Sequence, residues 1–366
     1  MRVKLGEITK IKTGKLDANA ASENGQYPFF TCSKEPLKID SYSYDCECVL
    51  VAGNGDLNVK YYNGKFDAYQ RTYIIEGKDS NQLYIPYLYY FLDGYVEVLR
   101  NESIGGVIKY IKLGNLTEAE IELPDMTCQK EIVNILDKVK QIIEDKKLQL
   151  LQLDELIKSR FVELFGEVGT DTKGWGLKRL GDCCTINPKK GEDKRLHQDL
   201  MISFVPMPAV SENGEIDASE TKSYNEVKTG FTYFAEQDVL FAKITPCMEN
   251  GKGAVARGLC NGIGFGSTEF HVLRPIEGIT NPYWIYTVTA FEQFRVDAAA
   301  NMTGSAGQRR VPASFLENYR IAVPPIEQQE QFAAFVEQTD KSKVAVQKSL
   351  DEVQVLYDKL MQEYFG

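Results

Sequence analysis

The second half of the chain repeats the first. Residues 123–166 align without gaps on residues 323–366 at a constant offset of 200, and both segments end in Phe-Gly. An ungapped register of this length is the signature of a duplicated structural unit, so the fold must use one unit twice. The identities in this register are Pro124/Pro324, Gln129/Gln329, Leu150/Leu350, Leu156/Leu356, Glu163/Glu363, Phe165/Phe365 and Gly166/Gly366.

Three weaker echoes extend the repeat toward the start of the chain. Because the offset rises from 175 to 198, the second half carries an insertion, predicted between Gly181 and Gly262 around residues 202–227. The echoes pair residues 3–11 with 178–186 (offset 175), 85–91 with 281–287 (offset 196) and 64–75 with 262–273 (offset 198).

Each unit begins with short apolar runs broken by Gly, Asn and Asp, a pattern that predicts strands and turns. One helix is predicted after Pro86 and one after Pro282, since proline is favoured in a first helical turn. The predicted fold class is α+β: two globular α/β domains separated by two long antiparallel coiled-coil helices, related by a pseudo-twofold internal repeat. The predicted limits are 1–122 for the first domain, 123–166 for a central helix, 167–322 for the second domain and 323–366 for a C-terminal helix.

The two predicted long helices carry heptad patterns. Apolar residues recur every seven positions in the first, and the second keeps the same register less regularly, which favours pairing of the helices with each other. Packing of each helix on its own domain is the alternative. At about 1.5 Å per residue, such helices span roughly 50 Å and would hold two domains apart at a fixed distance. The predicted seam consists of Leu136, Ile143, Leu150, Ile157, Leu164, Val336, Val346, Leu350, Val353 and Leu360.

The composition sets few limits on function. A net charge of −10 and a pI near 5.0 argue against a protein that binds nucleic acid over its whole surface. Both long segments are close to neutral, so a local basic face stays possible. The 8 cysteines form no Cys-x-x-Cys pair, which favours reduced thiols and a cytoplasmic protein. No apolar run predicts a membrane span, and no apolar leader is present at the start of the sequence.

No catalytic or metal-binding constellation is visible in the sequence. The 2 histidines, His197 and His271, lack metal or nucleophile-base spacing and are interpreted as surface or packing residues. No phosphate-binding loop closes with Lys-Ser/Thr. Asn-Pro-Tyr-Trp at 281–284 approaches the loop of amino-methylating DNA methyltransferases, but one proline is missing and the first half has Ile-Pro-Tyr-Leu. We therefore interpret Asn281 as a helix start, and predict no catalytic residue, no metal and no cofactor in this chain.

With two domains alternating with two long helices, the chain resembles the specificity (S) subunits of type I restriction-modification enzymes over essentially its whole length. The likeness rests on the Leu-Gly openings at 5–6 and 180–181 and on the segments 104–132 and 304–332. The first half lacks the Gly-Gln-Arg-Arg series of the second, which leaves a shared DNA contact there open.

The resemblance implies a function and partners. Each domain would read one half of a bipartite double-stranded DNA site, and the helices would set the spacer and dock two methyltransferase (M) subunits. S-adenosylmethionine would belong to the M subunits, and restriction (R) subunits would join through them. An acidic DNA mimic that blocks restriction and a stand-alone adenine methyltransferase are the alternatives.

Turn-rich polar stretches are the candidate DNA contacts, because base edges are read by Arg, Lys, Asn, Gln and Ser/Thr on loops and phosphates by Lys and Arg. Solvated loops, or bracing of the domain by the Gln-Arg-Arg run, are the alternatives for these stretches. The candidates in the first domain are Asn54, Asn58, Lys60, Tyr61, Tyr62, Lys65, Gln70 and Arg71. Those in the second domain are Lys189, Lys190, Lys194, Arg195, Lys243, Thr245, Asn250, Lys252, Gln308, Arg309 and Arg310.

Overall fold

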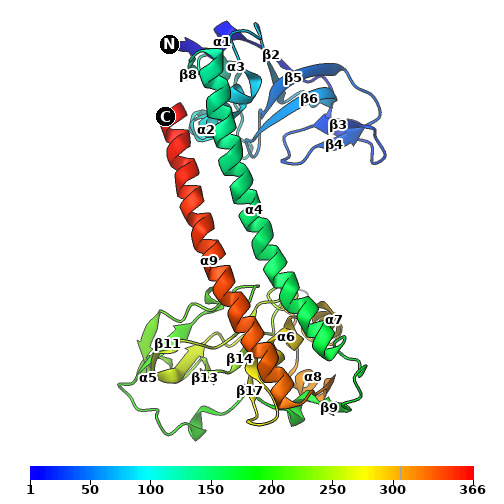
Figure 1. Cartoon of the computed structure of the whole chain (residues 1–366), viewed down its shortest axis with the longest axis vertical. Helices are drawn as coiled ribbons and strands as arrows, with labels where there is room; N and C mark the ends of the chain where they lie inside the picture. The colour runs from blue at the N-terminus through cyan, green and yellow to red at the C-terminus, as the bar shows by residue number, and fades with distance from the viewer. Residues whose placement is uncertain (306) are drawn as a thin grey trace. The chain divides into compact units, whose positions relative to one another are not determined.

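The computed structural model describes residues 1–305 and 307–366, which form two compact units. Unit 1 comprises residues 1–148 and 347–366, and unit 2 comprises residues 149–346. Two long helices, α4 (Met126–Phe165) and α9 (Ile326–Phe365), each contribute one part to each unit (Figure 1). They begin three residues inside the predicted helical segments, after the prolines; the predicted domain limits stay a prediction.

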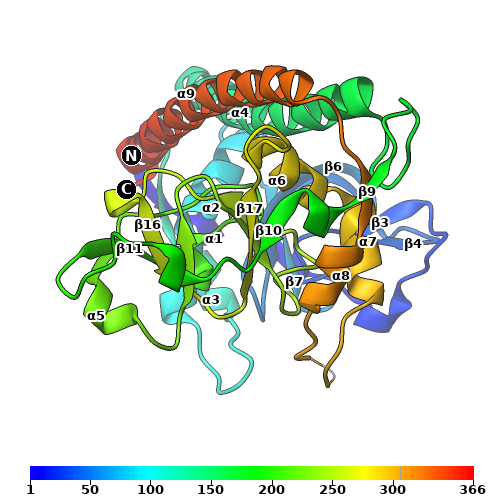
Figure 2. The same cartoon turned by 90° about the horizontal axis from the view of Figure 1, so that it is seen from below.

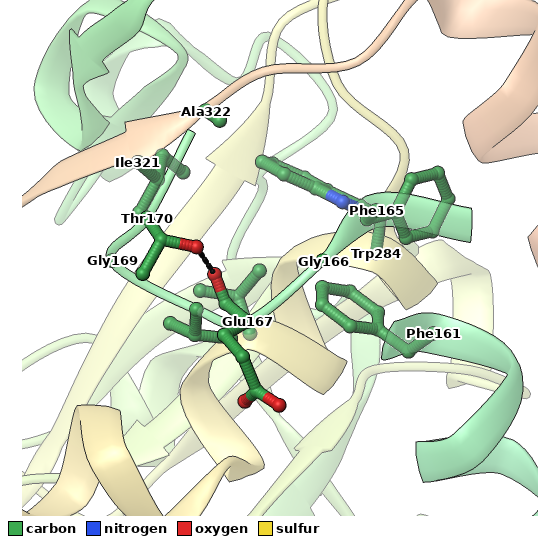
Figure 3. A pocket seen from close by; sticks show the side chains of 11 residues that line it. Phe161, Phe165, Gly166, Glu167, Gly169, Thr170, Trp284, Ile321 and Ala322 are labelled. Atoms are coloured by element: carbon green, nitrogen blue, oxygen red, sulfur yellow. Dashed lines mark hydrogen bonds between the residues drawn. The ribbon is translucent and has the colours of Figure 1, made fainter. Parts of the chain in front are cut away.

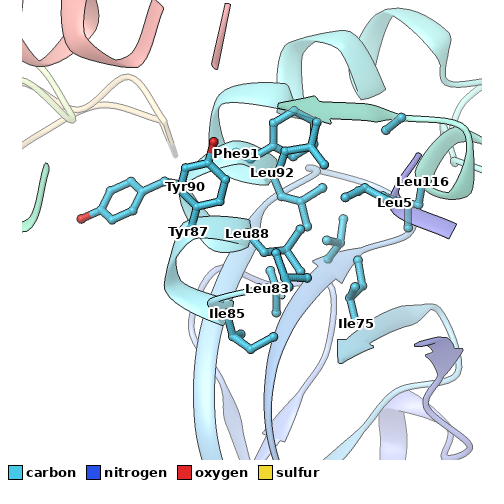
Figure 4. Packing of buried hydrophobic residues seen from close by; sticks show 14 of the residues in the cluster. Leu5, Ile75, Leu83, Ile85, Tyr87, Leu88, Tyr90, Phe91, Leu92 and Leu116 are labelled. Atoms are coloured by element: carbon cyan, nitrogen blue, oxygen red, sulfur yellow. The ribbon is translucent and has the colours of Figure 1, made fainter. Parts of the chain in front are cut away.

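Unit 1 is built on a six-stranded sheet of order β2-β7-β5-β6-β3-β4, with a separate β1-β8 pair. Helix α2 (Ile85–Glu102) packs on this sheet, and its apolar face forms the core with Leu5, Ile75 and Leu116 (Figure 4). The strands are β1 (Arg2–Lys4), β2 (Thr9–Thr13), β3 (Tyr27–Phe30), β4 (Leu37–Ile39), β5 (Tyr44–Ala52), β6 (Val59–Ala68), β7 (Thr72–Gly77) and β8 (Glu120–Glu122), and the short helices are α1 (Leu5–Ile8) and α3 (Leu113–Thr117).

Unit 2 contains two four-stranded sheets, of order β10-β17-β14-β15 and β12-β11-β16-β13, and a β18-β9 pair. Helix α6 (Pro282–Ala290) lies between the first of these sheets and α9 (Figure 2). The strands are β9 (Leu177–Arg179), β10 (Cys184–Ile186), β11 (Met201–Val205), β12 (Thr221–Ser223), β13 (Thr232–Ala235), β14 (Val239–Ala242), β15 (Gly253–Val255), β16 (Ile263–Gly266), β17 (Phe270–Pro275) and β18 (Arg320–Ala322). The further helices are α5 (Tyr224–Val227), α7 (Glu292–Ala300) and α8 (Ala313–Asn318).

The strand orders show the duplication directly. The order β2-β7-β5-β6 in unit 1 is matched by β10-β17-β14-β15 in unit 2, and β1-β8 is matched by β9-β18. The last residues of β6, Asp67 and Ala68, pair in parallel with β3, and the same parallel pairing recurs in unit 2 between β11 and β16. The extra residues of the second half are distributed over several loops, the longest of which joins β11 to β12. The predicted fold class, with two mixed domains, two long helices and an internal repeat, is confirmed.

One predicted register shifts by a single residue. Tyr84 and Asn281 are the equivalent N-caps of α2 and α6, which gives an offset of 197 where the sequence echo had suggested 196. In this register Tyr87 is equivalent to Trp284, and both side chains are fully buried. The offset of 196 aligns Pro86 with Pro282, but Pro86 is the second residue of its helix and Pro282 is the first residue of its own.

The long helices run antiparallel within each unit. In unit 1 the first turns of α4 share a core with the last turns of α9, through Leu136 and Leu360, and in unit 2 Phe161 of α4 packs on Phe332 of α9. The same turns also contact their own domain, so pairing and domain packing both occur. Of the predicted seam residues, Leu136, Ile143, Val336 and Val346 are buried, and Leu150, Ile157, Leu164, Leu350, Val353 and Leu360 are half-buried.

A fully buried glutamine near the start of each long helix forms hydrogen bonds that connect the helix to its domain. The Gln129 side-chain oxygen accepts from the Tyr84 backbone N–H (2.9 Å), and its amide donates to the carbonyls of Gln82 and Pro124 (both 2.9 Å). Gln329 makes the same three bonds in unit 2, with Asn281 N–H (2.9 Å) and the carbonyls of Ile279 (3.0 Å) and Pro324 (2.8 Å). Each glutamine thus satisfies backbone groups just before α2 or α6 and just before its own helix.

The shared Phe-Gly endings also have a structural role. Phe165 and Phe161 pack in the core of unit 2, and Gly166 takes a left-handed conformation (φ +81°) that ends α4. The chain then folds over Trp284, held by a bond from the Thr170 hydroxyl to Glu167 O (2.7 Å), and leaves a cavity of about 20 Å³ (Figure 3). In unit 1, Phe365 packs on Tyr87 with ring centroids 5.0 Å apart.

Gln329→Ala is expected to destabilise unit 2 by about 3 kcal/mol, because it leaves buried backbone donors and acceptors without partners. Both tryptophans, Trp175 and Trp284, lie in unit 2, so denaturant unfolding followed by tryptophan fluorescence reports on this unit. Gln331→Ala is the matched control, since Gln331 is exposed on the same helix, and it should change stability by less than about 0.5 kcal/mol. Equal losses in both variants would contradict the role of Gln329.

Candidate nucleic-acid interface

Three loops of unit 1 meet at the ends of β2, β5 and β7. Gly53 N–H donates to Arg71 O (2.8 Å), Ile111 N–H to Gly53 O (3.0 Å) and Gly55 N–H to Lys109 O (3.0 Å). These bonds join the loop after β5, the β6–β7 turn and the segment 104–111. Segments that are distant in sequence therefore present one continuous loop surface.

This surface contains a hollow of about 320 Å³ lined by Thr13, Gly53, Gln70, Arg71, Tyr73 and Ile111. The structure places the candidates Gln70 and Arg71 on its wall, both exposed, with Asn54 in the adjoining loop paired to Tyr110. Gln and Arg are side chains that read base edges or bind phosphate. Asn54, Gln70 and Arg71 are the predicted residues that unit 1 brings together.

The other candidates of unit 1 have structural contacts. The Asn58 amide donates to Cys32 O (2.9 Å) and Asp56 O (2.8 Å), so it shapes the loop. The Lys60 ammonium donates to Asn58 Oδ1, and burial lowers the pKa of Lys60. The hydroxyl of Tyr61 donates to Glu47 (2.8 Å), and Tyr62 packs on Phe30 and Phe66.

Lys65 lies on β6 and contacts a different part of the domain. Its ammonium is exposed and lies 4.7 Å from the centre of the Tyr42 ring. Tyr42 precedes β5, and neither residue lines the hollow beside Arg71. The predicted stretch 53–71 is therefore divided between the hollow and the face of the β5–β6 hairpin.

Unit 2 repeats the backbone bonds of this surface with different side chains. Lys243 N–H donates to Glu269 O (2.9 Å), and Val311 N–H donates to Lys243 O (2.9 Å). Gly53, Arg71 and Ile111 are thereby equivalent to Lys243, Glu269 and Val311. The hydroxyl of Tyr73 bonds to Ile111 O (3.2 Å), and Nε2 of the equivalent His271 bonds to Val311 O (2.8 Å).

The predicted arginines of unit 2 are paired with carboxylates. Arg310 donates to Glu269 through Nε (2.9 Å) and Nη2 (2.7 Å), and this pairing lowers the pKa of Glu269. Arg309 lies 3.5 Å from Glu249. Gln308 is exposed in the same loop, and burial lowers the pKa of the half-buried Lys243. Lys243, Gln308, Arg309 and Arg310 are brought together, with their charge largely balanced.

The remaining candidates of unit 2 lie in two other places. In the β14–β15 loop, Thr245 contacts Glu249, the Asn250 amide donates to Glu212 (2.9 Å) and Lys252 approaches Met207 O (3.4 Å). In segment 187–195, Lys190 donates to Lys228 O, and Arg195 is paired bidentately with Asp193, whose pKa it lowers. Lys189 and Lys194 are exposed. These contacts favour a folded loop over a row of free phosphate contacts.

Sequence reasoning missed several residues of these loop surfaces, among them Thr13, Tyr73, Tyr110, Glu249, Glu269 and His271. The alignment of 104–132 with 304–332 already placed Tyr110 opposite Arg310, and their main chains pair equivalently with Asn54 and Ile244. That equivalence was the available signal. The pairing of residues 64–75 with 262–273 likewise placed Glu269 opposite Arg71, but their opposite charges gave no indication of a shared role.

The structure agrees with the helix-start interpretation of Asn281. Its side chain caps α6 by accepting from Tyr283 N–H (2.9 Å), and Trp284 is buried in the core. His197 is exposed and His271 is buried, as surface and packing residues are. Among the side chains that the structure describes, no cluster of His, Cys, Asp or Glu has metal-site geometry, and no described helix is long and apolar enough to span a membrane.

His271 is hydrogen-bonded through both ring nitrogens. Asn187 Oδ1 accepts from Val272 N–H (3.1 Å), which leaves the Asn187 amide to donate to His271 Nδ1 (3.0 Å), while Nε2 donates to Val311 O. Burial lowers the pKa of His271. The hydrogen bond to Val311 O opposes this shift, Lys243 adds to it and Glu269 opposes it. The histidine thus fixes the end of segment 303–311 against β17.

The comparisons with known proteins agree with this architecture. Residues 1–153 and 172–354 match the sequence profile of the family described as the type I restriction modification DNA specificity domain, so the chain belongs to that family.

The chain is 42% identical over 176 residues to the specificity subunit of the type I restriction enzyme EcoDI of Escherichia coli, a match that covers 47% of this chain and 39% of that subunit. It is 44% identical over 155 residues to the EcoEI specificity subunit of the same organism, over 42% of this chain and 25% of that subunit. The matches thus span well under half of the relatives' length.

The fold is shared with the S subunit of a type I restriction-modification system from M. genitalium (TM-score 0.59, 15% identity, covering 100% of this chain and 96% of that one). A chain from a structure on complex assembly and conformational transition of the type I R-M system gives a TM-score of 0.57 at 15% identity, covering 100% of this chain and 97% of that one.

Unit 2 is expected to lose stability as the pH falls below about 6.5, the pKa of an unfolded histidine. Because the folded pKa of His271 is depressed, its stabilising contribution is complete above that pH and is lost as the pH falls toward the folded pKa. Denaturant midpoints from tryptophan fluorescence at pH 7.5 and 5.5 measure the change. His271→Gln should reduce the change in midpoint between the two pH values, and the exposed control His197→Gln should leave that change as it is in the wild type. A reduced change in His197→Gln but not in His271→Gln would contradict the assignment.

Proposed function

We propose that this chain is the DNA sequence-specificity subunit of a type I restriction-modification system and has no catalysis of its own. Each domain reads one half of a bipartite double-stranded DNA site. The observation that carries the proposal is the repeated loop surface: both units use the same backbone bonds, but Gly53, Arg71 and Tyr73 are replaced by Lys243, Glu269 and His271. A duplicated scaffold with different side chains suits a site whose halves differ in sequence.

The long helices set the spacing between the half-sites and dock two copies of the methyltransferase (M) subunit. Leu156 and Leu356, identical at the offset of 200, support this, because they are exposed to nearly the same extent (48% and 47%) on their helices. Equivalent apolar residues on a duplicated surface suit two copies of one partner. S-adenosylmethionine belongs to the M subunits in this proposal, restriction (R) subunits join through them, and the assembly acts in the cytoplasm.

The proposal is tested by producing the chain together with its M subunit and mapping methylated adenines across the genome. The expected result is one bipartite target with a fixed spacer. Binding of the M-bound complex to duplex DNA separates the alternatives, since an acidic DNA mimic competes with DNA and does not bind it. Methylation by this chain without an M subunit would instead favour a stand-alone methyltransferase.

Arg71→Ala is expected to weaken DNA binding by the assembled complex, because Arg71 lies exposed on the hollow of unit 1. A base-reading arginine contributes about 1–3 kcal/mol, roughly 5- to 150-fold in Kd, with relaxed specificity at one position of one half-site. A phosphate contact would instead lower affinity for all sequences and reduce the salt dependence. Exposed Lys10→Ala on β2 is the charge-matched control, and unchanged binding by Arg71→Ala would contradict the assignment.

Leu156→Lys combined with Leu356→Lys is expected to reduce binding of the M subunit at least tenfold, because both substitutions place a charge in a buried interface. Co-purification and titration with the isolated M subunit measure the loss. Leu151→Lys is the control: Leu151 is 63% exposed but lies about 140° around the helix from Leu156, and its equivalent is Asp351. Unchanged M binding by the double variant would contradict the docking role.

A further inference from the structure

The tip of the loop 104–110 in unit 1 exposes two aliphatic side chains. Val107 is fully exposed and Ile108 is 64% exposed. Removing apolar side chains from water lowers the free energy of the system. A fixed, exposed apolar tip is therefore a candidate contact for a ligand.

The tip is held in place by the interface loops. Ile104 and Tyr110 exchange two backbone hydrogen bonds (3.0 and 2.9 Å), and Gly55 N–H donates to Lys109 O (3.0 Å). Gly105 has φ +122°, and a Cβ there would lie 2.5 Å from Ile108 O, so the turn is closed tightly. Val107 and Ile108 therefore project from the same loop surface that carries Gln70 and Arg71.

The surroundings of the tip favour DNA over an apolar protein groove. Lys109 is exposed directly after Ile108, and Arg71 is exposed in the neighbouring turn. The equivalent loop of unit 2 is closed by the same pair of backbone bonds, between Thr303 and Arg310 (2.9 and 2.8 Å). That loop presents Gln308 and Arg309, side chains of the kind that read bases and bind phosphate. One scaffold thus carries polar side chains in one domain and an apolar tip in the other.

We propose that Val107 and Ile108 contact the C5-methyl group of a thymine in the major groove, so that unit 1 recognises one A·T pair of its half-site through this methyl group. The thymine methyl is the apolar feature of the major-groove edge, and aliphatic side chains recognise it by contact. The inference rests on the proposed function and adds a base identity to one half-site.

The test replaces single thymines of that half-site by deoxyuridine, which removes only the methyl group. The probe is the M-bound complex on its mapped target, and Kd is measured for each duplex. One position should weaken wild-type binding about fourfold, the ratio expected from one buried methyl group. The double variant Val107→Ser with Ile108→Ser should bind the thymine duplex about as weakly, with no further loss on deoxyuridine.

Val107→Thr keeps the side-chain shape and should retain part of the discrimination, whereas Val98→Ser, an exposed valine on α2, should retain all of it. Equal wild-type affinity for all deoxyuridine duplexes overturns the inference and leaves the proposed function intact. If the double variant fails to bind the M subunit, Val107 and Ile108 contact that protein instead of DNA, and the inference is wrong. Absence of specific DNA binding by the wild-type complex overturns the proposed function and the inference with it.

Discussion

The buried glutamine at the start of each long helix is the contact on which the rest of the structure depends. A single side chain bridges three backbone groups, two of them in the loop before α2 or α6 and one in the segment before its own helix. Removing such a bridge leaves polar groups unpaired in a site closed to water, which is costly. Because Gln129 and Gln329 form the same bonds, each domain is tied to its following helix in the same geometry.

That shared geometry separates the repeated core from the loop surface, whose side chains differ between the two units. The positions in and against the core keep their role between the two units: Gln129 matches Gln329, Phe165 matches the half-buried Phe365 and Tyr87 matches Trp284. The loop surface keeps its backbone bonds and changes its side chains, from Arg71 to Glu269 and from Tyr110 to Arg310. Backbone hydrogen bonds do not depend on side-chain identity, so the loops can vary in chemistry without loss of their shape.

The acidic balance of the chain also has a local explanation. The arginines of the unit 2 loops are held by carboxylates, Arg310 by Glu269 and Arg309 by Glu249. Ion pairs of this kind fix guanidinium groups in position while lowering the net positive charge of the surface. A net charge of −10 is therefore compatible with a nucleic-acid interface that works by positioned side chains and shares phosphate binding with partner subunits.

The sequence by itself determined the duplication, the two long helices and their heptad register, because hydrophobic periodicity and an ungapped repeat are properties of the chain order alone. It also marked Gln70 and Arg71 among many polar candidates. Only the tertiary structure decided which of these share a surface, since Gly53, Arg71 and Ile111 meet through backbone bonds between residues 18 to 58 positions apart. The structure likewise assigned Asn58 and Arg195 to intramolecular contacts. Long-range pairing of this kind leaves no periodic trace in a sequence, which is why the helices were predictable and the loop surface was not.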